Sequence, residues 1–446
     1  TNEARKVCKL LKLKSKQPDI FCVEVFAGMN KDMQEFAEHE DLYKQNGKYG
    51  RKIVIATNVA ESSLTIKGIK YVIESGYELL GSYDVKLKGR KLEKSIISHA
   101  QAKQRMGRAG RTEPGVCYHL YTKDLFENKM KKFPDPDIKK QDITTECLRL
   151  LNTDRVQILK KLRYMLTHFI EPPAEKYIDL AVNNLIQYKL VRNKTITQLG
   201  KLISELSLEP ILAIPLIYSK IYNCHNEVIN IVSLITAANS KLEDIFLTPE
   251  KILKNDIELR ENKELYDKEI ENLKNQINEK KIKFNHQLGD HLSLLNLYNE
   301  FSSRYTEDEY DNDDLLGWCE DNFIIYNTLV KAKKYARRNK KLIKDKLKHY
   351  KLDKMNEIIV EDTSDLSLDE KIIKSLHTGY FLQTATKSSD KNEYTMSHYK
   401  KKKIAIDSNS FILFNSEKPK DIFYHELFIS SMGMNLNIIS KLNKKN

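Results

Sequence analysis

Three arginines and a glutamine are closely spaced in the segment 104–111, which reads QRMGRAGR. On a helix, at 100° per residue, Gln104, Arg108 and Arg111 fall within about 60° of one another, whereas Arg105 points about 100° away from Gln104. Two guanidinium groups this close repel each other, and that cost is acceptable if an anionic phosphate lies between them. The pattern favours a phosphate-bearing ligand. A basic helix face exposed to solvent is the alternative.

The helix that must carry these side chains has start and stop signals of its own. Ser98, followed three residues later by Gln101, is typical of a capping box at a helix N-terminus. Gly110 is a residue at which a helix commonly ends. The sequence therefore predicts a helix from about residue 98 to Gly110, and its small glycine and alanine residues let a second surface approach closely.

A second polar segment, ATNVAESSLTI at residues 56–66, follows an apolar stretch directly. In α/β folds ligands bind where a strand ends in a loop, because backbone N–H groups and side-chain hydroxyls converge at that edge of the sheet. The segment is therefore a candidate ligand-binding loop. An ordinary turn with Ser and Thr caps is the alternative.

The elements around these segments alternate short apolar runs with helical patterns. We expect a helix at residues 3–13 and strands at 21–26, 52–57, 69–75 and 116–121. Residues 53–55 (IVI) are apolar on both faces, as in parallel strands that helices cover. Residues 1 to about 150 are thus predicted to form an α/β layer, 154–350 to be helical, and 379–384, 403–407, 411–414 and 422–430 to form a small barrel or sheet.

Two charged stretches interrupt the helical region. Residues 248–284 open with Thr248-Pro249-Glu250, a plausible N-cap with proline at the first helical position. Tyr266, Ile270, Leu273 and Ile277 then recur at helical spacing, which indicates either a short coiled-coil seam or a solvated helical excursion. The acidic residues at 307–314 are predicted to form a loop.

Length, charge and cysteine content limit the class of protein that this sequence can encode. The 446 residues suit three or four domains, and the formal charge of +13 favours a polyanionic partner, either nucleic acid or an anionic membrane face. Six cysteines without a C-x-x-C pair argue against a zinc site and a disulfide framework, and so indicate a reducing compartment. The apolar runs are shorter than the ~20 residues of a membrane span. We expect a soluble, intracellular protein without a membrane partner.

Together the two polar segments resemble motifs V and VI of superfamily 2 helicases, and their wording resembles the DEAH/RNA-helicase-A family. The resemblance continues along the chain. FIEPP at 169–173 and ITQLG at 196–200 resemble that family's winged helix, GDHLSLLN at 289–296 and WCEDNFI at 318–324 its helical-bundle (ratchet) domain, and GYFL at 379–382 and YHEL at 424–427 its OB-fold.

The resemblance implies a multidomain fold of α/β plus α plus β type. Residues 1–153 would be a partial second RecA-like lobe, 154–205 a winged helix, 206–350 a helical bundle with an insertion at about 248–284, and 351–446 an OB-fold. Neither G-x-x-x-x-G-K-[ST] nor D-E-x-H occurs. We therefore expect a piece of a longer protein that does not hydrolyse ATP by itself.

The resemblance also implies residue roles. Gln104, Arg108 and Arg111 would be catalytic, with the arginines stabilising charge on the γ-phosphoryl group, a contribution of about 10³–10⁵ in rate. ATP and Mg²⁺ would be held mainly by the first RecA-like lobe, whose motifs this sequence lacks. No metal ligand is expected in this chain. The implied nucleotide-binding set is Gln104, Gly107, Arg108, Arg111, Asn58 and Glu61. The implied RNA-binding set is Thr57, Ser63 and Thr65, with Lys333, Arg337 and Arg338 from a predicted basic helix at 331–348.

The whole enzyme would then be an ATP-dependent motor that translocates on single-stranded RNA and remodels duplexes with single-stranded overhangs or RNA–protein particles. A glycine-patch-type activator is a further partner that the resemblance allows. A non-catalytic RNA-binding scaffold derived from a helicase, or a related motor that acts on DNA, are the alternatives. Residues 76–98 would form a hairpin that either wedges a duplex or is a solvated basic hairpin. Tyr380, Phe381, Tyr394 and Tyr399 could stack bases or belong to a core, and His291 and Trp318 are expected to be structural.

Overall fold

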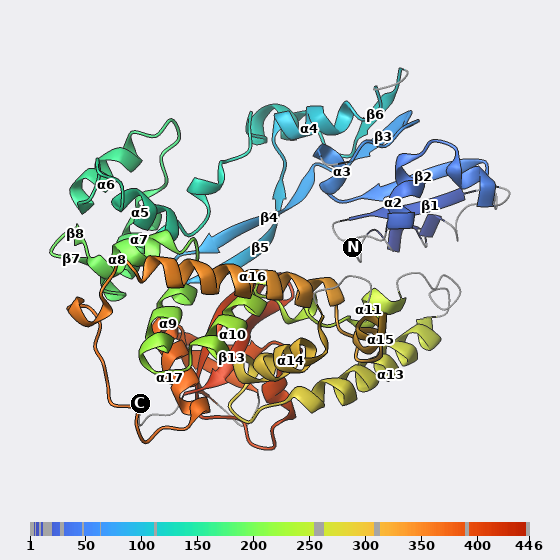
Figure 1. Cartoon of the computed structure of the whole chain (residues 1–446). Helices are drawn as coiled ribbons and strands as arrows, with labels where there is room; N and C mark the ends of the chain where they lie inside the picture. The colour runs from blue at the N-terminus through green and yellow to red at the C-terminus, as the bar shows by residue number, and fades with distance from the viewer. Residues whose placement is uncertain are drawn as a thin grey trace. The chain divides into compact units, whose positions relative to one another are not determined.

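The computed structural model divides the chain into two compact units. Unit 1 comprises Thr1–Gly81 and Leu92–Pro136, and unit 2 comprises Ser82–Lys91 and Asp137–Asn446. The structure describes residues 4, 6–8, 10–11, 20–26, 31–46, 49–62, 64–110, 114–253, 263–306, 313–388 and 392–442 (Figure 1). Of the predicted helix at 3–13, the described residues 4, 6–8 and 10–11 are helical, whereas most of the acidic stretch at 307–314 lies outside the described residues.

Unit 1 contains the four strands that the sequence predicts, in two parallel pairs. β1 (Ile20–Val25) pairs with β2 (Arg51–Ala56), and β3 (Tyr71–Glu74) pairs with β6 (Val116–His119). Val23 and Val25 are fully buried beneath α2 (Lys31–Glu38), whereas residues 53–55 are half-buried rather than covered on both faces. The remaining short elements are η1 (Leu42–Asn46), α3 (Val59–Ser62), α4 (His99–Met106) and a π-helical turn, η2 (Leu125–Lys129).

One disulfide contradicts the expectation from cysteine spacing. Cys8 and the β1 residue Cys22 are bonded to each other, with their Cα atoms 5.8 Å apart. Sequence spacing failed here because the separation of 14 positions between the two cysteines lets the chain fold back on itself. The other four cysteines have free thiols.

The predicted helical region at residues 154–350 is confirmed and lies in unit 2. Its hairpin of β7 (Val191–Arg192) and β8 (Thr195–Ile196) precedes α8, whose N-cap residue Thr197 accepts a hydrogen bond from the Gly200 N–H at 2.9 Å. Its helices are α5 (Thr144–Leu151), α6 (Leu159–Thr167), α7 (Glu175–Gln187), α8 (Gln198–Glu205), α9 (Pro210–Ile221), α10 (His225–Ala237), α14 (Asp290–Arg304), α15 (Asp313–Asp321), α16 (Tyr326–Lys346) and α17 (Leu368–Tyr380), with 3₁₀ turns η3 (Asp137–Lys139), η4 (Leu242–Asp244), η6 (Ile282–Phe284) and η8 (Leu352–Lys354).

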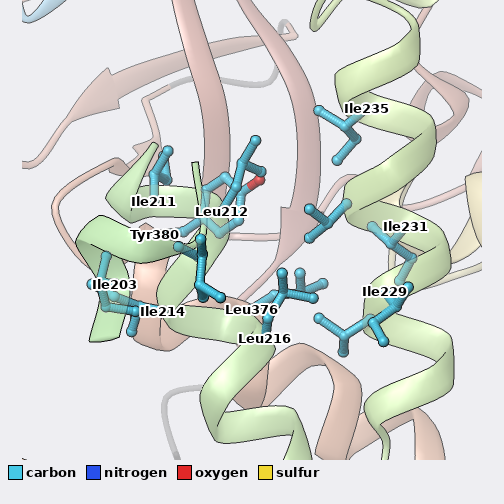
Figure 2. Close-up of a cluster of buried hydrophobic side chains, with 14 of the residues drawn as sticks. Ile203, Ile211, Leu212, Ile214, Leu216, Ile229, Ile231, Ile235, Leu376 and Tyr380 are labelled. Atoms are coloured by element: carbon cyan, nitrogen blue, oxygen red, sulfur yellow. The ribbon is translucent and has the colours of Figure 1, made fainter. Parts of the chain in front are cut away.

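The core of unit 2 lies between helices that are far apart in the sequence. Figure 2 shows apolar side chains of α8, α9, α10 and α17 packed together, among them Leu216, Ile231 and Leu376. Gly379 lets α17 approach α9, because a Cβ atom at this position would collide with the Ile211 carbonyl and lie 2.7 Å from the Pro215 ring. Residues after 351 therefore complete the helical core.

The charged stretch 248–284 forms two helices among the described residues. α11 (Pro249–Ile252) starts at the predicted proline, although the Thr248 side chain makes no capping hydrogen bond. α13 (Lys263–Lys281) buries Leu273 and Ile277, so the stretch is not a fully solvated excursion. At its end the buried Lys281 ammonium donates to the Asn409 carbonyl at 2.7 Å and lies over aromatic rings.

Five strands close into a barrel at the end of the chain. They are β9 (Thr384–Lys387), β10 (Glu393–Met396), β11 (Tyr399–Ile406), β12 (Asp421–Ser430) and β13 (Gly433–Lys441), in the order β13-β11-β10-β9-β12, and β12 pairs again with β13. The predicted strands at 403–407 and 422–430 are confirmed.

Two strand predictions in this region are wrong. Residues 379–380 end α17, whose start is fixed by a capping box between Ser367 and Glu370, and residues 411–414 form the 3₁₀ turn η9 (Phe411–Phe414). Apolar runs of four to six residues do not distinguish a strand from a buried helical turn. Tertiary contacts decide between them, because the buried Asp290 carboxylate accepts a hydrogen bond from the Phe411 N–H at 2.7 Å.

A buried histidine makes the stability of unit 2 depend on pH. His425 lies between Tyr380 Oη (3.0 Å) and Ser240 Oγ (2.7 Å), and burial, with the nearby Arg90 charge, lowers its pKa to about 4. The unfolded chain takes up this proton near pH 6.5, so stability is lost as pH falls from 6.5 towards 4.

We expect this histidine to cost on the order of 2 kcal/mol of stability between pH 7 and pH 5. Urea unfolding followed by the fluorescence of the single tryptophan, Trp318, would measure it at both pH values. His425→Gln retains hydrogen-bonding capacity without titrating and should lose less stability than the wild type over this range. An identical pH dependence in both proteins would contradict the prediction.

Among the described residues, no single helix is both long and apolar enough to cross a membrane. Only α8 and α9 taken together meet this length and composition, and they are bent by 109° relative to each other.

Candidate nucleotide and nucleic-acid site

The capping box at the start of α4 is confirmed, but the helix ends earlier than predicted. The Ser98 side chain accepts from the Gln101 N–H at 3.3 Å, and the Gln101 side chain accepts from the Ser98 N–H at 2.9 Å. α4 ends at Met106, four residues before Gly110, and Gly107 is its C-cap.

Beyond Gly107 the backbone tightens into a turn. The Arg108 N–H bonds to the Arg105 carbonyl at 3.1 Å, three residues back, and the Ala109 N–H bonds to that of Met106 in the same way. The turn packs against Gly115 so closely that a Cβ there would collide with the Ala109 carbonyl. The helical-wheel argument that placed Arg108 on one helix face with Gln104 is therefore wrong, and Arg111 lies outside the described residues.

Arg108 binds the backbone of the other motif segment. Its half-buried guanidinium donates from Nη1 to the Leu64 carbonyl at 2.8 Å and from Nη2 to the Glu61 carbonyl. Gln104 and Gly107 are exposed at the end of α4, and Arg111 lies outside the described residues. The structure thus brings the segments 56–66 and 104–110 into one site.

The sequence argument missed Arg105, which joins α4 to three other segments of unit 1. Its Nε binds Glu61 Oε2 at 2.8 Å, and its Nη1 binds Glu74 Oε1 at 3.0 Å and the Tyr77 carbonyl at 3.0 Å. The exposed fraction of the side chain is 11% for Glu61, 3% for Glu74 and 15% for Arg105. In the sequence, only the presence of Glu61 and Glu74 could have pointed to this role of Arg105, because an enclosed arginine requires acidic partners.

The remaining residues of the first segment follow β2. The Thr57 N–H bonds to the Val25 carbonyl at 2.9 Å, which fixes the end of β2 against β1. Asn58 is exposed, and its carbonyl accepts from the Glu61 N–H at 3.0 Å in the short helix α3. Thr65 is exposed, while Ser63 lies outside the described residues.

The hairpin between the two motif segments is formed by β4 (Tyr77–Asp84) and β5 (Gly89–Ile96). The alternative of a solvated basic hairpin is wrong for its tip, which is packed against the barrel. Leu87 is 8% exposed in the barrel core, and the Arg90 guanidinium binds Glu426 Oε1 at 2.8 Å. β5 also pairs with β12, with Phe428 opposite Arg90. Burial raises the pKa of Glu426 to about 7, although the Arg90 charge opposes this shift.

Comparisons with known proteins agree with this architecture. A model of the helicase conserved C-terminal domain matches residues 1–113, and a model of the ratchet-like helicase-associated domain (HA2) matches residues 209–294. A putative ATP-dependent RNA helicase, L540, of Acanthamoeba polyphaga mimivirus is 32% identical over 440 residues, which make up 96% of this chain and 59% of the relative. The chain resembles the C-terminal portion of the DEAH-box-type RNA helicases of superfamily 2.

The matched helicase C-terminal domain model covers both motif segments, which lie in the RecA-like α/β unit. The ratchet-like model covers α9 to the start of α14, including the charged helices α11 and α13.

The predicted basic helix is α16. Arg337 and Arg338 are exposed on it. Lys333, by contrast, is half-buried, and its ammonium lies over the rings of Tyr298 (5.7 Å) and Tyr305 (5.3 Å). The three predicted contact residues therefore differ in exposure.

Most of the other aromatic candidates are part of cores. Tyr380 and Tyr394 are fully buried, as is His291, whose pKa is lowered to about 3 by burial and the neighbouring His425. Trp318 packs edge-on against Phe284 at 6.3 Å.

Proposed function

We propose that this chain is part of an ATP-dependent motor that moves on single-stranded RNA and remodels duplexes or RNA–protein particles. The observation that carries the proposal is the joining of motif V and motif VI through Arg108, whose guanidinium binds the loop that follows β2. The mimivirus relative supports ATP and RNA as the substrates, and the chain spans 59% of its length.

Within this proposal, Arg108, Arg111 and Gln104 act on the nucleotide, and Asn58, Glu61 and Gly107 shape the site. Gln104 and Gly107 are exposed at the end of α4, and an arginine guanidinium suits a phosphate because it presents several N–H donors. The chain has no P-loop sequence, so ATP and Mg²⁺ would be held mainly by residues outside it, and Mg²⁺ would neutralise phosphate charge. The fragment alone should then be inactive.

The finer domain assignments are also part of the proposal. The helices α6, α7 and α8 with the β7–β8 hairpin suit a winged helix at 154–205, and the closed five-stranded barrel suits an OB-fold within 351–446. RNA would contact Thr57, Ser63 and Thr65 at motif V, and a glycine-patch-type activator is a further proposed partner.

The decisive experiment measures ATP turnover of the full-length protein with single-stranded RNA, with single-stranded DNA and without nucleic acid. We expect stimulation by RNA. Stimulation by DNA alone would favour the DNA motor, and no turnover under any condition would favour the non-catalytic RNA-binding scaffold.

A basic stripe on α16 is the proposed RNA contact outside the motifs. At 100° per residue, the exposed cations Lys334, Arg338 and Lys341 lie within about 60° of one another. Binding there would be independent of RNA sequence and sensitive to salt, because it depends on phosphate charge and counterion release.

Replacing Arg338 and Lys341 together with alanine should weaken RNA binding equally for different RNA sequences. The slope of log affinity against log salt concentration should become shallower by about 1.4, or about 0.7 for each phosphate of a single strand that is no longer neutralised. Fluorescence anisotropy at several salt concentrations would measure both quantities. Lys268→Ala, which removes an exposed cation from α13, is the matched control, and an equal slope change in the control would contradict the assignment.

A further inference from the structure

Arg105 is a largely enclosed cation of motif VI, with 15% of its side chain exposed, to which the proposed function assigns no role. Its guanidinium binds three separate segments of unit 1: Glu61 in α3, Glu74 at the end of β3, and the carbonyl of Tyr77, the first residue of β4. A planar guanidinium presents its N–H groups in a fixed fork, so it can hold three partners in one arrangement, whereas a lysine ammonium cannot span them.

The root of the hairpin is held to α4 by further bonds. Glu74 Oε1 accepts from the Gly76 N–H at 2.7 Å, and the Gln101 side-chain amide donates to Glu78 Oε2 at 2.7 Å. The Ile97 N–H closes the hairpin base on the Gly76 carbonyl at 3.1 Å. The position of β4 at its root is therefore set by the helix that carries motif VI.

The same hairpin ends inside unit 2. Its tip, Ser82–Lys91, belongs to that unit, where Leu87 lies in the barrel core and Arg90 binds Glu426. Two hydrogen-bonded strands thus connect the Arg105 network at the root to the β12 strand of the barrel, by continuous backbone.

We propose that Arg105 is a positioning residue that couples the motif V loop to the hairpin root, so that movement of α3 during the nucleotide cycle displaces β4 and, through it, the barrel. The inference rests on the proposed ATP-dependent motor. It assigns Arg105 to the conversion of ATP turnover into strand separation and gives it no part in ATP hydrolysis itself.

The test uses the full-length protein and an RNA duplex with a single-stranded overhang. Arg105→Lys keeps the charge but cannot bridge the three partners. A second variant, Arg105→Met combined with Glu74→Gln, removes the charges of Arg105 and of its more buried partner together, so that Glu61, 11% exposed, is the one carboxylate of the three-residue network that loses its cation. Lys103→Met removes an exposed cation from the same helix and is the matched control. ATP turnover with single-stranded RNA, KM for ATP, and strands separated per ATP hydrolysed are measured for each protein.

Both Arg105 variants should keep ATP turnover and KM close to wild type, while strands separated per ATP fall by about tenfold or more, as expected when two coupled sites are disconnected. Wild-type strand separation per ATP in either folded variant would overturn the role of Arg105 and leave the proposed function standing. Loss of ATP turnover with unchanged separation per ATP would place Arg105 in the hydrolysis site and also overturn the coupling role. A wild-type protein without RNA-stimulated turnover would overturn the proposed function itself.

Discussion

Under the proposed function, replacing Arg108 with alanine in the full-length protein should lower RNA-stimulated ATP turnover by about 10³-fold or more, the range found when an arginine finger is removed. The structure adds a second reason for a large loss, because the variant also frees the carbonyls of Glu61 and Leu64 and loosens the motif V loop. RNA affinity should stay nearly intact. Steady-state turnover at saturating RNA and equilibrium RNA binding would measure the two effects separately. Arg111→Ala is expected to have the same effect on turnover.

Two variants sharpen this experiment. Arg108→Lys keeps the positive charge but not the fork that holds two carbonyls, so it should also lose most of the turnover. Lys103→Ala removes an exposed cation from α4 and should retain wild-type turnover. Full turnover in Arg108→Ala would reject the role assigned to this residue.

The largest expected effect on stability is that of Asp290→Ala. The Asp290 carboxylate is fully buried at the start of α14 and accepts hydrogen bonds from the Phe411 N–H (2.7 Å), the Ile439 N–H (2.8 Å) and the Ser410 hydroxyl (2.9 Å). It therefore ties the helical core to η9 and to β13 of the barrel. Alanine would leave two buried backbone N–H groups without partners, at a cost of about 3 to 5 kcal/mol in the free energy of unfolding.

Urea unfolding at pH 7.5, followed by Trp318 fluorescence, would measure this loss within unit 2. Asp369→Ala is the matched control, because Asp369 is 48% exposed and pairs with His286 at 3.1 Å on the surface. Its loss should cost less than about 1 kcal/mol. Equal destabilisation by the two variants would show that the buried carboxylate does not hold the barrel to the helices.

Elements with strong local signals could be predicted from the sequence. Ser98 and Gln101 form the predicted capping box, and the strands 21–26 and 116–121 are present, because these patterns depend on residues close together in the chain. Short apolar runs were less informative. Residues 411–414 became a turn since Asp290, more than a hundred positions earlier, binds their backbone.

The candidate site shows the same division. Its two polar segments were found from their residue types, yet the end of α4 at Met106 and the engagement of Arg108 by backbone carbonyls were not. Arg105 was set aside because a helical wheel turns it away from Gln104. Its partners Glu61 and Glu74 are 44 and 31 residues away, and no local pattern announces them.

The sequence by itself determined that a candidate ligand-binding loop at 56–66 follows a strand of an α/β layer and that the arginines of 104–111 suit a phosphate. It also determined that helices and a small β structure come after this layer. Only the tertiary structure decided that Cys8 bonds to Cys22, that the hairpin tip is buried in the barrel, and that one arginine joins motif V to the hairpin root. Residue type and spacing fix what a side chain can bind, whereas the partner it does bind depends on which distant segments the folded chain brings together.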